Sequence, residues 1–260
     1  MSGSITKKTS TFGWVEMGAE NLDKAKQFYE TVFGWTGTIA KSNSPMPYAV
    51  MNNNNGVTSG IYQLTEEMKM NKIPPHWLAY IYVNNVNNTL ELAVKSGGKI
   101  IQPAFDVDRV GRMAVVSDPS GAVLAIWEAD EKAMEMASGK FAPCWYELGT
   151  RDIKICEKFY ADVFGWNSRK DNSMGMEYVI FSVNETMIGG MYQIPEEMKE
   201  YPSSWCIYFE VNDFERISGL AVSNGAKIIG QVMEYEKIGK FAYLQDPQGA
   251  VFSIIKSAEM

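Results

Sequence analysis

The chain has 260 residues, of which 46% are hydrophobic, and its formal net charge at neutral pH is −7. This length favours two domains, and the apolar content is sufficient for two hydrophobic cores. The acidic balance argues against binding to nucleic acid or to an anionic membrane surface, because both require clustered lysine and arginine. No apolar run is long enough to span a bilayer, so we expect a soluble cytoplasmic protein.

Cysteine and histidine are scarce. The cysteines are Cys144, Cys156 and Cys206, and the only histidine is His76. The cysteines are odd in number and share no CxxC spacing, so buried thiols are expected rather than a disulfide framework or a zinc knuckle. One imidazole cannot supply a histidine-rich metal site or a Ser-His-Asp triad to each half of the chain.

The chain contains an internal repeat of two copies. The first part of copy one, from Trp14 to Gln63, is predicted to form a strand, a helix and three further strands. Trp14–Gly18 is the first strand, and Asn21 caps a helix with apolar residues at helical spacing that ends at Gly34. Three short strand candidates follow, separated by Asn, Ser and Pro turns: Trp35–Ala40, Tyr48–Met51 and Val57–Gln63. We name this βαβββ arrangement a module.

The same order returns after a polar connector, Thr65 to Pro75. His76–Val83 is a predicted strand, and Asn85 caps a helix that Gly97 and Gly98 end. The three remaining strands are Lys99–Gln102, Arg112–Val116 and Ala122–Glu128, with Asp118-Pro119-Ser120-Gly121 as a type I turn before the last. Copy one therefore contains two modules.

The repeat itself is visible in the helix segment. Residues 14–35 recur at residues 145–166, a shift of 131 residues from Trp14 to Trp145, and nine of the 22 aligned positions are identical. Repetition at half the chain length predicts two fused copies of one domain, and hence four modules. We place the domains at residues 12–129 and 142–257, with the joint between the copies at residues 133–140.

Paired βαβββ modules, a helix ending in FYxxVFGW and a late DPxG hairpin in each copy resemble the vicinal-oxygen-chelate superfamily. This superfamily includes glyoxalase I, extradiol dioxygenases and bleomycin-resistance proteins, and the WxE opening is similar to that of tandem glyoxalase-like bacterial proteins. The resemblance implies an α+β fold of two tandem glyoxalase-like domains. Each domain would comprise two modules that form a cup-shaped, mostly antiparallel sheet with the helices outside.

In metal-dependent members of this superfamily, His or Gln on the first strand, Glu on the fourth, His on the fifth and Glu on the eighth hold a divalent metal. The resemblance places the first-, fifth- and eighth-strand positions at Trp14, Leu78 and Ala125 in copy one and at Trp145, Cys206 and Ser253 in copy two. Neither fourth strand contains an acid. Indole and aliphatic groups do not coordinate such ions, so we expect no metal cofactor. The alternative is a divalent metal near Glu16 and His76.

Alternation along a strand places Glu16 on the same face as Trp14, and Glu147 on the same face as Trp145. Both carboxylates are candidate catalytic groups, because desolvation beside an indole would raise their pKa toward that of a general base. Hydrogen bonding to a ligand is one alternative; a structural bond, with Arg112 and Lys240 as possible partners, is the other. The candidate ligand-binding residues are Trp14, Tyr62, His76, Leu78, Tyr80, Ala125, Trp127, Trp145, Tyr192, Cys206, Tyr208 and Ser253.

We therefore expect a small-molecule-binding protein whose metal-free, apolar cup takes a hydrophobic or aromatic molecule, as the resemblance to bleomycin-resistance proteins implies. One alternative is an enzyme of the same superfamily: a metal-dependent or acid/base lyase, isomerase, hydroxylase or dioxygenase. Another is a non-catalytic scaffold whose cups are filled by their own side chains. In each case the chain is expected to be a monomer or a homodimer.

Overall fold

The structure is a computed structural model, and it describes residues 9–40, 46–107, 110–131, 133–172 and 175–258. Copy one forms two modules, as predicted. The first consists of β1 (Phe12–Ala19), α1 (Leu22–Phe33), β2 (Thr36–Ile39), β3 (Tyr48–Asn53) and β4 (Gly56–Gln63). A short helix, α2 (Glu66–Met70), leads to the second, which consists of β5 (His76–Tyr82), α3 (Val86–Lys95), β6 (Lys99–Val107), β7 (Gly111–Ser117) and β8 (Val123–Ala129).

Copy two repeats this order. The third module consists of β9 (Pro143–Thr150), α4 (Ile153–Phe164), β10 (Asn167–Asp171), β11 (Tyr178–Val183) and β12 (Thr186–Gln193). A 3-10 turn, η1 (Glu196–Met198), leads to the fourth, which consists of β13 (Ser204–Glu210), α5 (Phe214–Ser223), β14 (Lys227–Tyr235), β15 (Gly239–Gln245) and β16 (Val251–Ser257). The prediction of four modules is confirmed.

The strands form two eight-stranded mixed sheets, in the orders β2-β3-β4-β1-β5-β8-β7-β6 and β10-β11-β12-β9-β13-β16-β15-β14. In each module the first strand runs parallel to the last, as β1 does to β4 and β5 to β8. The other pairings within a module are antiparallel. The predicted α+β fold of two tandem repeats, each of paired βαβββ modules, is therefore confirmed.

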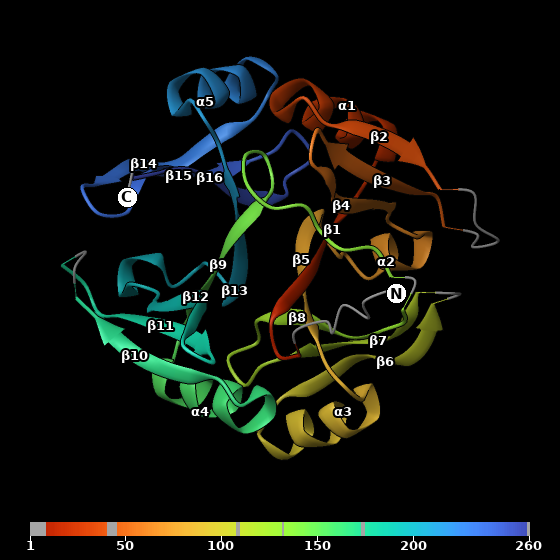
Figure 1. The fold of residues 1–260 in the computed structure, drawn as a ribbon, viewed down its shortest axis with the longest axis vertical. Helices are drawn as coiled ribbons and strands as arrows, with labels where there is room; N and C mark the ends of the chain where they lie inside the picture. The colour runs from red at the N-terminus through yellow and green to blue at the C-terminus, as the bar shows by residue number, and fades with distance from the viewer. Residues whose placement is uncertain (1–8, 41–45, 108–109, 132, 173–174, 259–260) are drawn as a thin grey trace, which may run out of the picture. The chain divides into compact units, whose positions relative to one another are not determined.

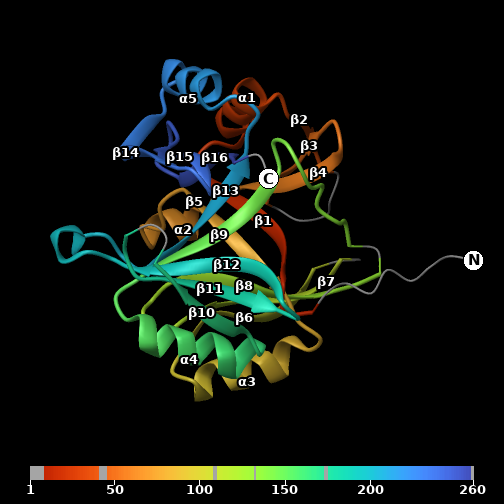
Figure 2. The same ribbon diagram turned by 60° about the vertical axis from the view of Figure 1, so that its left-hand side comes forward.

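The chain divides into two compact units, and each unit takes one module from each copy. Unit 1 comprises the described parts of Met1–Gly13, Ala79–Met134 and Tyr146–Trp205; unit 2 comprises those of Trp14–Leu78, Glu135–Trp145 and Cys206–Met260. In unit 1, α3 packs against α4, and in unit 2, α1 packs against α5 (Figures 1 and 2). The boundaries at 12–129 and 142–257 follow the repeat along the sequence and stay a prediction.

Local sequence signals explain where α1 begins and ends. The side chain of Asn21 accepts a hydrogen bond from the backbone nitrogen of Lys24 at 2.9 Å, which satisfies a donor of the first turn. Gly34 adopts a left-handed conformation, with φ of 68°, and its N–H caps the carbonyl of Glu30. Both predicted ends of this helix are confirmed.

A buried hydrogen bond joins the two copies within unit 2. Tyr29 of α1, fully buried, donates its hydroxyl to Oδ2 of Asp246 at 3.0 Å and accepts from Nε1 of Trp77 at 2.9 Å. Oδ1 of Asp246 accepts from the backbone nitrogens of residues 248–250, so this carboxylate also fixes the DPxG turn. The FY motif of copy one is thus paired with the DPxG motif of copy two.

Unit 1 contains the reciprocal pair. Tyr160 of α4 donates to Oδ2 of Asp118 at 3.0 Å and accepts from Nε1 of Trp205 at 2.8 Å. Burial, followed by the charge of Asp118, holds the pKa of Tyr160 well above its ordinary value, so the phenol stays protonated as the donor. The indole of Trp205 therefore packs against α4.

Candidate functional site

The predicted carboxylate of copy one lies in a cluster of hydrogen-bonded side chains in unit 2. Glu16, half-buried on β1, accepts at Oε1 from the indole Nε1 of Trp14 at 3.0 Å and from the hydroxyl of Tyr48 at 2.6 Å. Tyr48 begins β3, two strands away from β1 in the sheet. The short phenol–carboxylate contact is a charge-assisted hydrogen bond that orients both groups.

A second pair, Tyr62 and His76, lies in the same unit. The hydroxyl of Tyr62 is 3.0 Å from Nε2 of His76, and Nδ1 of His76 is 2.8 Å from the carbonyl oxygen of Pro74. A carbonyl can only accept, so Nδ1 carries the proton, and in a neutral ring Nε2 accepts from Tyr62. The structure therefore fixes the tautomer of this imidazole.

The protonation states follow from burial. Desolvation lowers the pKa of His76, against smaller opposing effects of the Pro74 carbonyl and the Glu16 charge, so the imidazole is neutral at pH 7. Burial, followed by the negative charge of Glu16, raises the pKa of both Tyr48 and Tyr62 above its ordinary value. Both phenols are consequently protonated hydrogen-bond donors at neutral pH.

Two glycines make room for these phenols. Gly60 lies opposite Glu16 in the β1–β4 register, and a Cβ at Gly60 would stand 1.9 Å from the hydroxyl oxygen of Tyr48. A Cβ at Gly18, opposite Tyr62, would stand 2.8 Å from the hydroxyl oxygen of that residue. Glycine is needed at both positions because the aromatic rings lie across the backbone of the neighbouring strands.

Copy two keeps the carboxylate–phenol pair in unit 1 but changes its surroundings. Tyr178 donates to Oε1 of Glu147 at 2.9 Å, and Gly190 makes room for this phenol as Gly60 does in copy one. Glu147 is only 6% exposed, whereas Glu16 is half-buried. The position of His76 is taken in copy two by Ser204 at the start of β13, so copy two lacks the imidazole.

Tyr48 is not among the residues predicted from the sequence, although the repeat contains a signal for it. Tyr48 and Tyr178 begin the third strand of their copies, and in the β3–β4 and β11–β12 registers they lie opposite Tyr62 and Tyr192. Together with the recurring glycines, this repetition marks the phenol as part of the site.

The suggested basic partners of the two carboxylates are wrong. Nη1 of Arg112 is 2.6 Å from Oδ1 of Asp106, and Nζ of Lys240 is 2.5 Å from Oε1 of Glu215. Arg112 thus pairs with Asp106 and Lys240 with Glu215, whereas tyrosine hydroxyls donate hydrogen bonds to Glu16 and Glu147.

The other candidates of copy one divide between the units. Tyr80, Ala125 and Trp127 belong to unit 1, where Tyr80 is opposite Ala125 in the β5–β8 register and its ring centroid is 6.3 Å from that of Trp127. Leu78 is buried in unit 2. A ligand site that combines these residues with Glu16 stays a prediction.

Three copy-two candidates, Trp145 on β9 and Cys206 and Tyr208 on β13, meet in unit 2. Tyr208, Phe241 and Ile255 form a buried cluster, against which the partly buried Trp145 and Cys206 pack. This apolar and aromatic group has the composition expected of a hydrophobic cup. Among the other candidates, Ser253 is fully buried and donates its hydroxyl to the carbonyl of Ala242 at 2.8 Å, while Tyr192 lies beside Gly149 in unit 1.

The donor set does not fit the metal centre of the superfamily. Trp14, Leu78 and Ala125 cannot supply imidazole or carboxylate ligands. Within the described ranges, no three His, Cys, Asp or Glu side chains are grouped so that they could hold a metal ion. Both ring nitrogens of His76 are hydrogen-bonded to protein groups, so its present orientation does not serve the alternative site near Glu16.

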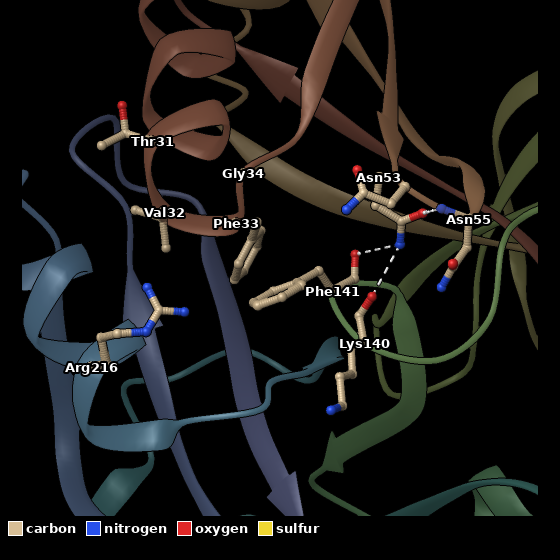
Figure 3. Close-up of a pocket in the computed structure, with 10 residues that line it drawn as sticks. Thr31, Val32, Phe33, Gly34, Asn53, Asn55, Lys140, Phe141 and Arg216 are labelled. Atoms are coloured by element: carbon tan, nitrogen blue, oxygen red, sulfur yellow. Dashed lines mark hydrogen bonds between the residues drawn. The ribbon is translucent and has the colours of Figure 1, made fainter.

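Two clefts of unit 2 lie away from the predicted residues. One, of about 490 Å³, lies at the C-terminal end of α1 and is drawn in Figure 3; the other, of about 540 Å³, lies at its N-terminal end. None of the predicted site residues lines either cleft. Lys140 and Arg216 line the first of these clefts.

Comparison with known proteins supports the fold and the family. Residues 11–126 match the model of the Glyoxalase/Bleomycin resistance protein/Dioxygenase superfamily, so the resemblance to this superfamily is confirmed. The chain is 29% identical over 258 residues to "Putative glyoxylase CFP32" of Mycobacterium tuberculosis, and the alignment covers 96% of each protein. It is 25% identical over 259 residues to "Anthracycline biosynthesis protein DauV" of a Streptomyces species, covering 95% of this chain and 93% of the relative.

Solved structures share the fold at low sequence identity. A Mn(II)-bound glyoxalase from Novosphingobium aromaticivorans superposes with a TM-score of 0.65 at 13% identity, covering 97% of this chain and 83% of that chain. The 2,3-dioxygenase LapB from Pseudomonas sp. KL28 gives 0.62 at 13% identity, covering 97% and 94%. Among the described residues, no helix combines the length and apolar character needed to cross a membrane.

Proposed function

We propose that the protein binds a small hydroxylated aromatic molecule at the Glu16 cluster of copy one, and that this binding requires no metal. The observation that carries the proposal is the half-buried carboxylate of Glu16, held between the indole of Trp14 and the hydroxyl of Tyr48. A carboxylate fixed in this way is a preorganised acceptor for the hydroxyl groups of a ligand, and fixing it before binding reduces the entropy that binding costs.

The difference between the copies favours copy one. A structural carboxylate–phenol bond would serve equally well in both copies, and in copy two Glu147 is indeed buried. In copy one the equivalent carboxylate is more exposed and the Tyr62–His76 pair lies in the same unit. Accessibility and extra polar groups are properties expected of a binding site rather than of a packing contact.

The ligand class follows from the chemistry of these groups. Glu16 accepts hydrogen bonds, and the phenols of Tyr48 and Tyr62 can donate or accept them, so ring hydroxyls of a ligand complement the cluster. The indole of Trp14 is only 4% exposed, and the partly exposed ring of Tyr48 supplies the aromatic surface that complements a ligand ring. A relative named for anthracycline biosynthesis is consistent with an aromatic ligand of this kind.

Calorimetric titration of chelator-treated protein with 2,3-dihydroxynaphthalene tests the proposal. The dimethyl ether of this probe cannot donate hydrogen bonds and should bind at least tenfold more weakly. Glu16→Gln should weaken binding of the diol about tenfold, about 1.4 kcal/mol. The matched variant Glu147→Gln should change it less than twofold. Equal effects of the two substitutions, or equal binding of the diol and its ether, would contradict the proposal.

A second candidate function is metal-free acid/base catalysis, favoured by one observation. The neutral imidazole of His76 is oriented by Pro74 so that Nε2 accepts a hydrogen bond from the hydroxyl of Tyr62. Such a pair could pass a proton between a bound ligand and the imidazole. Exchange of the diol's ring hydrogens for deuterium, followed by NMR, would reveal this activity. Catalysis predicts that the wild type accelerates the exchange and that His76→Gln and Tyr62→Phe return it to the uncatalysed rate. If the wild type also exchanges at the uncatalysed rate, the protein binds the ligand without turning it over.

A further inference from the structure

The cleft at the C-terminal end of α1, which we name the α1 cleft, combines an apolar floor with two cations. Val32, Phe33 and Phe141 line its base; Val32 and Phe33 are only 1% and 3% exposed, whereas Phe141 is partly exposed. The rings of Phe33 and Phe141 are 6.3 Å apart and point toward one another in Figure 3. Lys140 and Arg216 also line the cleft. Its volume of about 490 Å³ lies within the ordinary range for small-molecule sites.

No acidic residue lines this cleft, although the protein as a whole is acidic. Among the residues that the structure describes, neither Lys140 nor Arg216 has a carboxylate within ion-pair distance. Two cations without acidic partners, beside an apolar floor, produce a local positive potential that attracts an anion.

Lys140 and Phe141 lie at the joint between the copies and line the α1 cleft. Because the chain is a repeat, they can be compared with the equivalent residues of unit 1. Trp35 donates its indole N–H to the carbonyl of Phe141, and the equivalent Trp166 donates to that of Ser10. Phe141 and Ser10 share a left-handed backbone, with φ of 59° and 63°. Phe141 therefore corresponds to Ser10, and the preceding Lys140 corresponds to the uncharged Thr9.

Other lining residues of the α1 cleft are also more positive, or less negative, than their equivalents in unit 1. Arg216 and Asn88 both donate their backbone N–H to the cap residue of their helix, so they occupy equivalent positions. Thr31 stands three residues before the glycine that ends α1, and Asp162 stands three before the one that ends α4. In the strand turns, Asn55 corresponds to Glu185. The positions of unit 1 equivalent to these lining residues thus hold two acids and no cation, although Lys158 pairs with Asp162 from the same helix, whereas the lining of the α1 cleft holds two cations and no acid.

The end of a helix provides a simpler explanation for a nearby cation, since its terminal carbonyls carry partial negative charge. Helix α1 has no basic residue in its last turn, so Arg216 could compensate this charge. However, α4 also lacks a basic residue in its last turn, and Asn88 stands in place of the arginine there. The fold therefore tolerates this helix end without a cation, and compensation does not explain Arg216.

We infer that the α1 cleft is a second binding site, specific for a small aromatic carboxylate and independent of the Glu16 cluster. The guanidinium of Arg216 matches the two oxygens of a carboxylate, and Lys140 adds a second charge. The partly exposed ring of Phe141, backed by the buried Phe33 and Val32, takes the flat apolar body of the ligand.

The test uses the full chain and three probes: 1-naphthoate, its neutral isostere 1-naphthamide, and inorganic phosphate. Calorimetry gives the dissociation constants, and amide NMR shifts of Gly34, Asn54 and Phe141 locate the bound probe. Naphthoate should bind at least tenfold more tightly than either other probe, and raising the salt concentration should weaken it. Arg216→Ala and Lys140→Ala should each weaken naphthoate binding fivefold or more. Lys237→Ala, which removes one exposed charge outside the cleft, should change it less than twofold.

Each contrary result has a definite meaning. Equal binding of naphthoate and naphthamide would exclude recognition of the charge, and equal binding of phosphate would exclude recognition of the ring. Saturable binding without shifts in the cleft would place the ligand elsewhere. Each of these results overturns the inference. Glu16→Gln should leave naphthoate binding at the cleft unchanged, so failure of the proposed function and failure of this inference are distinguishable.

Discussion

Replacing Tyr29 with phenylalanine tests the pairing of the FY motif of copy one with the DPxG motif of copy two. The substitution removes the hydroxyl that donates to Asp246 and accepts from Trp77 in a fully buried environment. A hydrogen bond to a charged group contributes about 1.5–3 kcal/mol, and an unsatisfied buried donor costs about 1–3 kcal/mol. We therefore expect the free energy of unfolding to fall by about 2.5–6 kcal/mol.

Urea unfolding followed by circular dichroism measures this change. Tyr201→Phe alters an exposed tyrosine and should stay within about 0.5 kcal/mol of wild type. Because Tyr29 and Asp246 are in contact, the combined effect of Tyr29→Phe and Asp246→Asn should fall short of the sum by about 1 kcal/mol or more. The pair Tyr29→Phe and Asp118→Asn, which share no partner, should be additive. A loss below 1 kcal/mol for Tyr29→Phe, or coupling to Asp118 instead of Asp246, would refute the pairing.

Two further predictions concern the Glu16 cluster. Gly60→Ala should displace the phenol of Tyr48 from Glu16, destabilise the protein by about 1–3 kcal/mol through overpacking, and abolish binding of 2,3-dihydroxynaphthalene, whereas the matched Gly190→Ala should destabilise it similarly and leave binding intact; unchanged binding in Gly60→Ala would contradict the role of Tyr48. The pKa of His76 lies below 6.5 in the folded state, so the unfolded state takes up its proton first as the pH falls, and stability should be lost on acidification from about pH 6.5 down to the folded pKa. His76→Gln should lack this part of the pH dependence in urea titrations, and a wild type whose stability rises over that interval relative to the variant would disprove the assigned direction.

The modules could be predicted from the sequence because their signals are local or repetitive. Asn21 and Gly34 delimit α1 through contacts within a few residues, and the Asp118 turn closes by a hydrogen bond from the N–H of Gly121 to the Asp118 carbonyl. The partner of Tyr29 could not be predicted in this way, because Asp246 lies 217 residues further along the chain. Only the folded structure shows that the two motifs of the superfamily meet between copies.

The candidate site was predictable in part. Parity along β1 correctly placed Trp14 beside Glu16, since neighbouring residues on one face of a strand are two apart. The hydrogen bond from Tyr48 to Glu16 depends on the order of β3, β4 and β1 in the sheet. The pattern of residues within one strand does not contain this information. The α1 cleft draws its lining from α1, the β3–β4 turn, the joint between the copies and α5, and no local pattern connects these segments.

The most direct test of the proposed function is a calorimetric titration of chelator-treated protein with 2,3-dihydroxynaphthalene, before and after addition of one equivalent of Mn(II). Recognition by Glu16 and its neighbours predicts the same dissociation constant in both titrations and its loss in Glu16→Gln. Binding that occurs only after Mn(II) is added would show that a metal ion, rather than the carboxylate–phenol cluster, holds the ligand.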